Sequence, residues 1–474
     1  MNSQNLILAR RIFDIESQRL FAKISGDCNP IHVDPIHARR TTLGQCIVHG
    51  VHAVLWALES YALLNSHYFS ELNVRFLKPI YLDEEITCSW DQAKQQLILS
   101  SDGVVLVRIK TKLAAFPGRV FGAIKRASPA LTPENNTFLE CEKRVDRLFQ
   151  VHGDCESLRG LFPNVAATYG FEVLYEIAEL SYLIGMQCPG LHSLFGGFNI
   201  SFGANENECP RYSVVSSDYR FSSLTLKVFA KNFQGEVQAF YRPPPVKNPS
   251  INEVAAYVDK GEFSKIHALI IGGSRGLGEL VAKVIGAGGG SSLITYKAGK
   301  DEAKAVADEI SAYGSFSEAC QFIAGTNQGF PMGLDGITQV YYFASPKILG
   351  KRSAKFDSNQ LNLYMLAYVE AFESTVRYLI SVGLKPVIFY PSTIFIEEHQ
   401  KDFELYVEAK KQGELKCKQL SRELNLKILP VRLPKLSTDQ TQTMFSQACE
   451  NGLGAMLSVV RKMNCLESHK NFLL

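Results

Sequence analysis

The sequence has almost no net charge and no long hydrophobic run. Its 50 basic and 47 acidic residues give a formal net charge of +3, and the basic residues are scattered, which argues against nucleic-acid binding. No window reaches the about 18 uninterrupted apolar residues of a membrane-spanning helix. The first 20 residues carry charges within the first apolar stretch and show no cleavage-site pattern. We therefore expect neither a membrane helix nor a signal peptide.

Paired cysteines are also missing. The 11 cysteines are odd in number, and no two of them stand in a C-x-x-C spacing. This pattern argues against a disulfide framework or a zinc site and favours reduced thiols in a cytoplasmic protein. A hydrophobic content of 46% and a charged content of 20% predict a globular chain. Its 474 residues correspond to roughly three domains.

Residues 1–118 combine a polar loop, an apolar helix and a series of strands. The expected helix covers residues 50–64 and is apolar on most faces, which predicts that it is buried. Alternation and β-branched residues predict antiparallel strands at 71–76, 85–90, 97–100 and 104–113. A buried helix wrapped by such a sheet is the hotdog arrangement.

Residues 119–242 read as a second, weaker copy of the first segment. Another apolar helix is expected over 165–186, and the strand 193–202 parallels 69–76, including its small-residue start and its final Phe. Further strands are expected at 212–215, 224–230 and 235–241, but the copy lacks an Asp-x4-His loop. The sequence thus predicts an α+β double hotdog in which one half keeps the chemistry and the other walls the substrate.

A proline-rich stretch, residues 242–249, marks the clearest boundary in the chain, and we expect a linker over 243–264. From residue 265 to residue 474 the pattern changes to strand, glycine turn, helix and strand. That order predicts an α/β domain of the Rossmann type with a doubly wound parallel sheet.

Asp27 and His32 stand five residues apart in a loop that Pro30 stiffens, so both side chains are expected to reach one water. Dehydration of a 3-hydroxyacyl thioester removes a proton from C2 and donates one to the leaving hydroxyl, which a carboxylate and an imidazole do together. The thioester oxygen gains charge and needs donors, which we place at the helix start near Gly50 and Val51.

This region resembles the MaoC-like, R-specific enoyl-CoA hydratases. The matching strings are Ser25-Gly26-Asp27, Asn29-Pro30-Ile31-His32, Asp34, Ile47-Val48-His49-Gly50 and Phe76-Leu77-Lys78-Pro79-Ile80. The resemblance implies that Asp27 and His32 are the catalytic pair. The alternative is a hotdog binding module with an ordinary polar loop. We expect no metal, because His37, His49 and His52 have no acidic or cysteine partners to complete a ligand set.

A glycine-rich turn follows the expected strand 267–271 and precedes an expected helix at 279–285. In it, Gly272 allows a tight turn, while Gly276 and Gly278 let the backbone approach a pyrophosphate. An NAD enzyme usually places an acidic residue after the next strand, which here ends in Tyr296-Lys297. We therefore expect NADP(H). The predicted cofactor-binding residues are Gly272, Ser274, Arg275, Gly276, Leu277, Gly278, Tyr296, Lys297 and Ala344.

The spacing of this turn, with Ser392 and Tyr406-x3-Lys410 behind it, resembles the short-chain dehydrogenase/reductase family. The resemblance implies that Tyr406 is the general acid, that Ser392 holds the carbonyl, and that Lys410 binds the ribose and lowers the pKa of Tyr406. Two departures stand out. The family's strand end appears here as Tyr342-Phe343-Ala344-Ser345-Pro346, and Tyr368 replaces a helix Asn, with Asn362 about two turns early.

Together these patterns predict a bifunctional enzyme that reduces a 3-ketoacyl thioester with NADPH and dehydrates the 3R-hydroxyacyl product, or works in reverse. One alternative is a hydratase with a non-catalytic, NADP-binding reductase-like domain; another is a non-catalytic acyl-thioester-binding protein. The partner is an acyl-CoA or an acyl carrier protein, whose phosphate Arg39 and Arg40 are placed to meet. The family resemblances imply a homo-oligomer.

Overall fold

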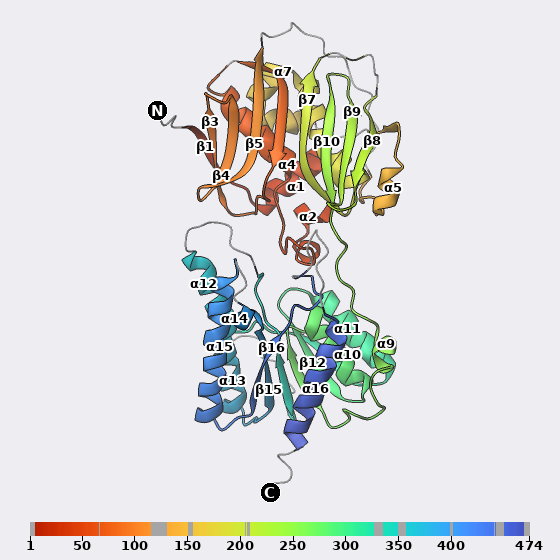
Figure 1. The fold of residues 1–474 in the computed structure, drawn as a ribbon, viewed down its shortest axis with the longest axis vertical. Helices are drawn as coiled ribbons and strands as arrows, with labels where there is room; N and C mark the ends of the chain where they lie inside the picture. The colour runs from red at the N-terminus through yellow and green to blue at the C-terminus, as the bar shows by residue number, and fades with distance from the viewer. Residues whose placement is uncertain are drawn as a thin grey trace. The chain divides into compact units, whose positions relative to one another are not determined.

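The computed structural model describes residues 5–65, 67–114, 130–149, 155–203, 205, 209–326, 335–348, 357–398, 402–439, 441 and 450–468. The chain divides into two compact units (Figure 1). Among the described residues, those up to Pro244 form the first unit and those from Pro245 onward form the second. In the described part of the chain, every helix is too short or too polar to cross a bilayer.

The first unit is built on one antiparallel sheet, which has ten strands among the described residues. Five strands from the start of the chain form one side, and five later strands form the other. In spatial order they are β1 (Leu6–Ile12), β3 (Glu85–Asp91), β4 (Gln96–Ser101), β5 (Val104–Ala114), β2 (Tyr68–Phe76), β7 (Ser193–Phe202), β10 (Phe233–Tyr241), β9 (Ser223–Phe229), β8 (Arg211–Asp218) and β6 (Arg147–Leu148).

The two sides of the sheet meet where β2 pairs with β7. These are the two segments whose sequences parallel each other, and equivalent residues face one another, Asn73 opposite Asn199. Gly197 lies in a conformation with φ of 155°, and a Cβ there would collide with the carbonyl oxygen of Val74. Glycine at this position therefore allows the two halves to join as one continuous sheet.

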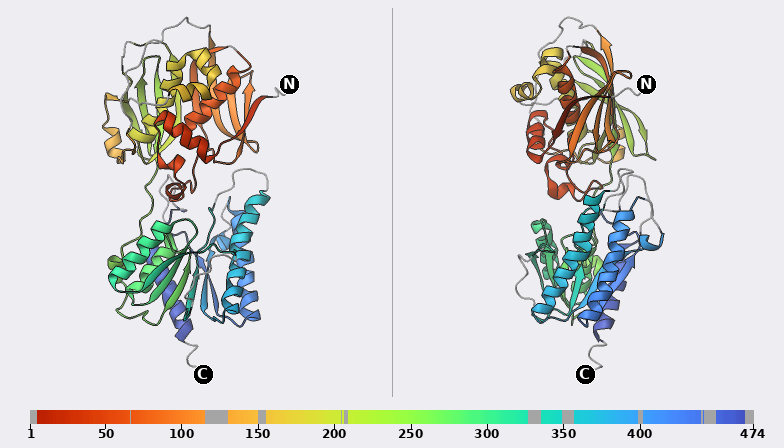
Figure 2. Two further views of the ribbon diagram at one scale, coloured as in Figure 1. Left: turned by 180° about the vertical axis from the view of Figure 1, so that it is seen from behind. Right: turned by 90° about the vertical axis from the view of Figure 1, so that its left-hand side faces the viewer.

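Helices gather on one face of this sheet (Figure 2). The main buried ones are α4 (Gly50–Ala62), α7 (Pro163–Tyr169) and α8 (Phe171–Tyr182). Our prediction of one helix over 165–186 was wrong. Gly170, with φ of 86° and ψ of 155°, separates α7 from α8, and η1 (Leu183–Gln187) continues α8 as a π-helix. The glycine conformation is incompatible with a helix, although the apolar pattern runs across it.

Glu59 on α4 ties the two halves together. Its carboxylate accepts hydrogen bonds from the backbone N–H groups of Asn164 (3.1 Å) and Val165 (2.9 Å), at the start of α7. These are among the N–H groups that a helix cannot satisfy internally. A side chain of the first half thus caps a helix of the second.

The second unit contains a parallel sheet, which has six strands among the described residues. Their order is β13 (Ser317–Gln321), β12 (Ser291–Tyr296), β11 (His267–Ile271), β14 (Gln339–Tyr342), β15 (Val387–Thr393) and β16 (Ile428–Leu433). Alternate residues enter two separate cores. Ile270 packs with α10 (Gly276–Ala287) and α16 (Gly452–Ser468), while Leu269 packs with α13 (Ala371–Ser381) and α15 (Glu404–Glu423). Helices therefore cover both faces.

The segment 243–264, expected as a linker, packs as part of the second unit from Pro245 onward. It contains a short helix, α9 (Ile251–Ala255), which Ser250 and Glu253 cap and whose Ile251 is buried. Asn248 donates its side-chain N–H to the carbonyl of Gly276 (2.8 Å). This segment consequently supports the glycine-rich turn from outside.

Candidate active sites

The loop that carries Asp27 and His32 is fixed at both ends. Helix α1 (Ile15–Ser25) ends at Gly26, whose φ of 76° turns the chain away from the helix. Asn29 then caps the short helix α2 (Pro30–Val33) through a hydrogen bond from the Ile31 N–H to Asn29 Oδ1 (3.2 Å). The loop therefore presents Asp27 and His32 from a backbone that hydrogen bonds hold in place.

A hydrogen bond to the backbone fixes which ring nitrogen of His32 carries the proton. Its Nδ1 donates a hydrogen bond to the carbonyl oxygen of Ile47 (2.8 Å), and because that oxygen only accepts, the proton of the neutral ring lies on Nδ1. Burial, reinforced by the charge of Arg242, lowers the pKa of His32 to about 4, against the Ile47 bond that raises it. At neutral pH the ring is thus neutral, with the lone pair on Nε2.

The carboxyl group of Asp27 is shifted towards its protonated form. Its side chain is almost fully buried, and burial raises the pKa of Asp27 to about 7. Two hydrogen bonds oppose that shift, one from Ser181 Oγ to Oδ2 (2.7 Å) and one from the Asn29 N–H to Oδ1 (3.2 Å). A carboxyl group with this pKa holds a proton through much of the neutral range.

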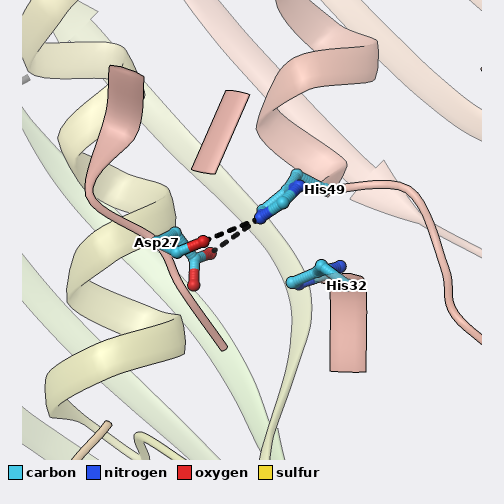
Figure 3. Close-up of side chains that lie close together, drawn as sticks. All are labelled: Asp27, His32 and His49. Atoms are coloured by element: carbon cyan, nitrogen blue, oxygen red, sulfur yellow. Dashed lines mark hydrogen bonds and ion pairs between the residues drawn. The ribbon is translucent and has the colours of Figure 1, made fainter. Parts of the chain in front are cut away.

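His49, just before α4, links the two residues (Figure 3). Its Nε2 lies 3.0 Å from the Asp27 carbonyl oxygen and 4.0 Å from Asp27 Oδ2, and its ring stacks on His32 with a centroid separation of 3.9 Å. On the other side, Nδ1 lies 3.0 Å from Gln18 Oε1. Sequence reasoning treated His49 as part of the helix-start string and expected it to lack an acidic partner. The contact with Asp27 contradicts that expectation and marks His49 as a site residue.

Asp27, His32 and His49 also have the spacing of a metal-binding group, since their ligand atoms lie within 4.8 Å of one another. Both ring nitrogens of His49 face oxygen atoms, so a metal bound there would have to displace one of these contacts. His32 Nδ1 donates to Ile47, which leaves Nε2 of His32 for either a proton or a metal.

The second half of the first unit encloses Asp27. Besides Ser181 of α8, Gly185 of η1 lies so close that a Cβ there would collide with Asp27 Oδ1 and stand 2.6 Å from Oδ2. Asn29 donates its side-chain N–H to the carbonyls of Gly185 (2.8 Å) and Gly190 (3.0 Å). Sequence reasoning missed Ser181 and Gly185; the one visible signal was a glycine inside an apolar helical run.

Gly50 is the first residue of α4, and no side chain caps this helix start. A Cβ at Gly50 would lie 2.7 Å from Cζ of Phe76 on β2, so a larger residue would have to push the Phe76 ring aside. The backbone N–H groups that follow, including that of Val51, are the unsatisfied donors of the helix end. The helix starts at Gly50, as the predicted oxyanion site requires, and its role as that site stays a prediction.

The glycine-rich turn in the second unit is as tight as its sequence predicts. Gly272 has φ of 83°, and a Cβ there would lie 3.0 Å from the carbonyl carbon of Phe343 and 3.2 Å from the Ala344 nitrogen. A Cβ at Gly278 would collide with the Gly272 carbonyl oxygen. Gly276 has φ of 59°, and a Cβ there would meet nothing within 4 Å, which leaves room beside the start of α10.

The residues expected around a 2′-phosphate differ in their exposure and in their ion pairs. Lys297, which follows Tyr296 at the end of β12, is exposed. Arg275 instead forms an ion pair with Asp439, with a separation of 3.1 Å between Nη1 and Oδ2. Ser274 is buried in the turn, and Leu277 lies in the first turn of α10. The positive charge expected from Arg275 is thus partly neutralised by the protein itself.

Ser392, expected to hold a carbonyl group, is committed elsewhere. It lies in β15, and its Oγ donates to Glu414 Oε1 at 2.6 Å. The same carboxylate accepts hydrogen bonds from Arg432 Nε (2.8 Å) and Nη2 (2.7 Å). The Ser392 hydroxyl therefore donates its hydrogen bond to a carboxylate on α15, and its role in holding a carbonyl group stays a prediction.

Tyr406 and Lys410 lie close together on α15, but the pKa of Tyr406 is not shifted in the expected direction. Burial raises the pKa of Tyr406 and lowers the pKa of Lys410 to about 7. Lys410 Nζ donates to the carbonyl of Pro391 (2.6 Å) and lies 3.8 Å from the centroid of the Tyr368 ring. We expected Lys410 to lower the pKa of Tyr406, and burial outweighs that effect.

Comparisons with known proteins identify one class of domain in the chain. Residues 10–112 match the MaoC like domain family, so the segment that carries Asp27, His32 and Gly50 is a MaoC-like domain. No curated protein sequence matched the chain.

Among solved structures, the chain is similar to the landomycin C-6 ketoreductase LanV with bound NADP and rabelomycin, at 20% identity, over 43% of this chain and 90% of that one, with a TM-score of 0.39. It is also similar to a short chain dehydrogenase from Burkholderia cenocepacia in complex with NADP. That similarity has 19% identity over 42% of this chain and 89% of that one, with a TM-score of 0.37.

Proposed function

We propose that the chain is a bifunctional acyl-thioester enzyme. It reduces a 3-ketoacyl thioester with NADPH and dehydrates the (3R)-hydroxyacyl product to the trans-2-enoyl form, or hydrates in reverse. Residues 1–118 and 119–242 are the halves of a double hotdog, and 265–474 form a doubly wound Rossmann-type domain. Coenzyme A or an acyl carrier protein carries the substrate, and the chain works as a homo-oligomer. The observation that carries the hydratase part of this proposal is the cluster of Asp27, His32 and His49, whose polar side-chain atoms lie within 4.8 Å of one another.

In the dehydration direction, His32 Nε2 takes the proton from C2 of the hydroxyacyl thioester. The negative charge that develops on the thioester oxygen is stabilised by the N–H groups at the start of α4, near Gly50 and Val51. Asp27 gives its proton to the leaving hydroxyl, which departs as water while the C2–C3 double bond forms. Hydration reverses each transfer, so Asp27 then takes a proton from water and His32 returns one to C2.

The pH dependence follows from these roles. Dehydration requires protonated Asp27 and neutral His32, a combination present between the two pKa values of about 4 and about 7. We expect kcat/KM for (3R)-hydroxybutyryl-CoA to fall about tenfold per unit above pH 7, and again below pH 4. A pH–rate profile measures this; a flat profile from pH 6 to pH 9 would contradict the assignment of Asp27 as the acid.

For the second unit, the glycine-rich turn supports NADP(H) binding, because the space beside Gly276 and the close packing of Gly272 and Gly278 fit a pyrophosphate at the start of α10. Lys297 would meet the 2′-phosphate. When bound, NADPH supplies the hydride for the carbonyl carbon. Tyr406 would donate its phenolic proton to the carbonyl oxygen, and Lys410 would hold the ribose.

The test is to mix the purified chain with acetoacetyl-CoA and NADPH and to follow NADPH absorbance and product mass. We expect NADPH consumption and a product lighter than the hydroxyacyl thioester by one water. Hydration of crotonyl-CoA in a parallel sample reports the first unit alone. Failure of that hydration would overturn the proposal for the Asp27 site.

A second candidate is a hydratase whose reductase-like domain binds NADPH without using it. The hydrogen bond from Ser392 to Glu414 favours it, since a serine engaged by a carboxylate does not position a carbonyl group. Binding of NADPH without consumption by any of a series of 3-ketoacyl thioesters, alongside intact crotonyl-CoA hydration, would establish this candidate in place of the first.

A further inference from the structure

Arg242, the residue after β10, is buried without a counter-charge. Its side chain has 0% exposure, although arginine is almost never fully buried unless it is paired. Nη2 donates to the carbonyl of Leu191 (2.5 Å), but in the described part of the chain Nε and Nη1 have no hydrogen-bond partner. A buried guanidinium with two unused donors is costly, and such groups call for an explanation.

The charge of Arg242 acts on several histidines, and one carboxylate, that of Asp34, acts on His37 and raises its pKa. The charge of Arg242 acts on His37 and His192, whose pKa values burial and Arg242 both lower. Within the described residues, His37 Nε2 and His192 Nδ1 are also buried without a partner. The phenol of Tyr241, and no carboxylate of the described residues, acts to raise the pKa of Arg242, which burial lowers to about 10. Arg242 therefore stays charged at neutral pH.

This cluster lies next to the Asp27 site. The Arg242 N–H donates to the carbonyl of His192 (2.8 Å), and its Nη2 binds Leu191, one residue from Gly190. Gly190 in turn accepts the hydrogen bond from Asn29, which stands between Asp27 and His32. The segment 190–193 thus lies between Arg242 and the loop that carries Asp27 and His32.

We propose that Arg242, together with His37 and His192, receives an anionic group of the acyl-thioester substrate. The chemistry is that of an oxyanion, either a phosphate ester of the carrier or a carboxylate on the acyl chain, since both match guanidinium donors. Arg40, which we expected to meet the carrier phosphate, also lowers the pKa of His37. This inference rests on the proposed hydratase function and names what its substrate must carry.

Three hydration substrates separate the two sources of the anion. Crotonyl-CoA carries the phosphates, crotonyl-pantetheine lacks them, and glutaconyl-CoA adds a terminal carboxylate. If Arg242 binds the carrier, the wild-type chain prefers crotonyl-CoA to crotonyl-pantetheine by about ten- to a hundredfold in kcat/KM. If it binds an acyl carboxylate, glutaconyl-CoA is preferred to crotonyl-CoA by a similar factor.

The variant Arg242→Gln should erase the preference, because it lowers kcat/KM for the anionic substrate far more than kcat/KM for the substrate without the anion. Arg220→Gln is the matched control, because it removes one positive charge from an exposed position in the same unit. A preference that survives in Arg242→Gln overturns the proposal, and so does a wild-type chain without either preference. The wild-type comparison needs no variant, so it tests the proposal even if Arg242→Gln does not fold. In that case His37→Gln serves as the milder substitution and should reduce the preference severalfold.

Failure of the proposed function gives a different result. If no thioester is hydrated, the Asp27 site is not a hydratase, and the anion site is tested by thermal unfolding with inorganic pyrophosphate or glutarate. A rise in Tm for wild type that is absent in His37→Gln supports the site. No rise with either anion overturns it.

Discussion

Replacing Asp27 with asparagine is expected to reduce crotonyl-CoA hydration by about 10²–10⁴-fold, the usual contribution of a positioned acid or base. The amide has nearly the same shape, so it keeps the contacts with Ser181 and the Asn29 N–H, but it neither gives nor takes a proton at neutral pH. Because burial already disfavours the charged carboxylate, shown by its pKa of about 7, the neutral amide should not lower stability. Steady-state kinetics with crotonyl-CoA, paired with thermal unfolding, measure both effects.

Asp102→Asn is the matched control for this substitution. Asp102 is exposed in the turn between β4 and β5 with φ of 47°, a conformation that asparagine also adopts readily. It should leave kcat, KM and Tm unchanged. If Asp27→Asn keeps full activity, Asp27 is not the acid. If wild type and Asp27→Asn bind crotonyl-CoA equally and neither hydrates it, the first unit is an acyl-thioester-binding module.

Local features of both sites could be predicted from the sequence because they depend on neighbours along the chain. A five-residue loop with a proline brings Asp27 near His32, and a strand followed by glycines predicts the turn at Gly272. The same reasoning located the segments of β2 and β7 as related copies, and the sheet pairs them at Asn73 and Asn199. Short-range spacing and strand alternation carry this information.

The partners of the site residues could not be predicted, because they come from distant parts of the chain. Ser181 lies 154 residues from Asp27. Glu414, which accepts the hydrogen bond of the Ser392 hydroxyl, belongs to a different element of the fold. Nothing in a single sequence marks such a serine or glutamate. Nor does the sequence mark Arg242 as a site residue, because it stands only at the start of a proline-rich boundary. In the structure it is fully buried. Tertiary packing determines the burial and the hydrogen-bond partners of Asp27, Ser392 and Arg242.

Gly185→Ala should reduce hydration by about 10²-fold without unfolding the protein. The added Cβ would collide with Asp27 Oδ1 and lie 2.6 Å from Oδ2, so the carboxyl group must move. Displacement of a catalytic group by about 1 Å costs roughly a hundredfold in rate. Helix propensity alone would favour alanine by about 1 kcal/mol, so a loss of activity has to come from the displaced carboxyl group rather than from a weakened helix.

Gly160→Ala is the matched control, since Gly160 lies in helix α6 (Cys155–Leu161), is exposed, and has nothing within 4 Å of the added Cβ. It should keep full activity and an equal or higher Tm. If Gly185→Ala retains wild-type kcat/KM, the second half does not position Asp27 and is only a wall for the acyl chain. If activity falls while Tm stays within a few degrees, the second copy, which lacks an acid–base pair of its own, contributes to catalysis by fixing the acid of the first. That outcome would explain why a half without its own catalytic loop still has to contain a glycine at position 185.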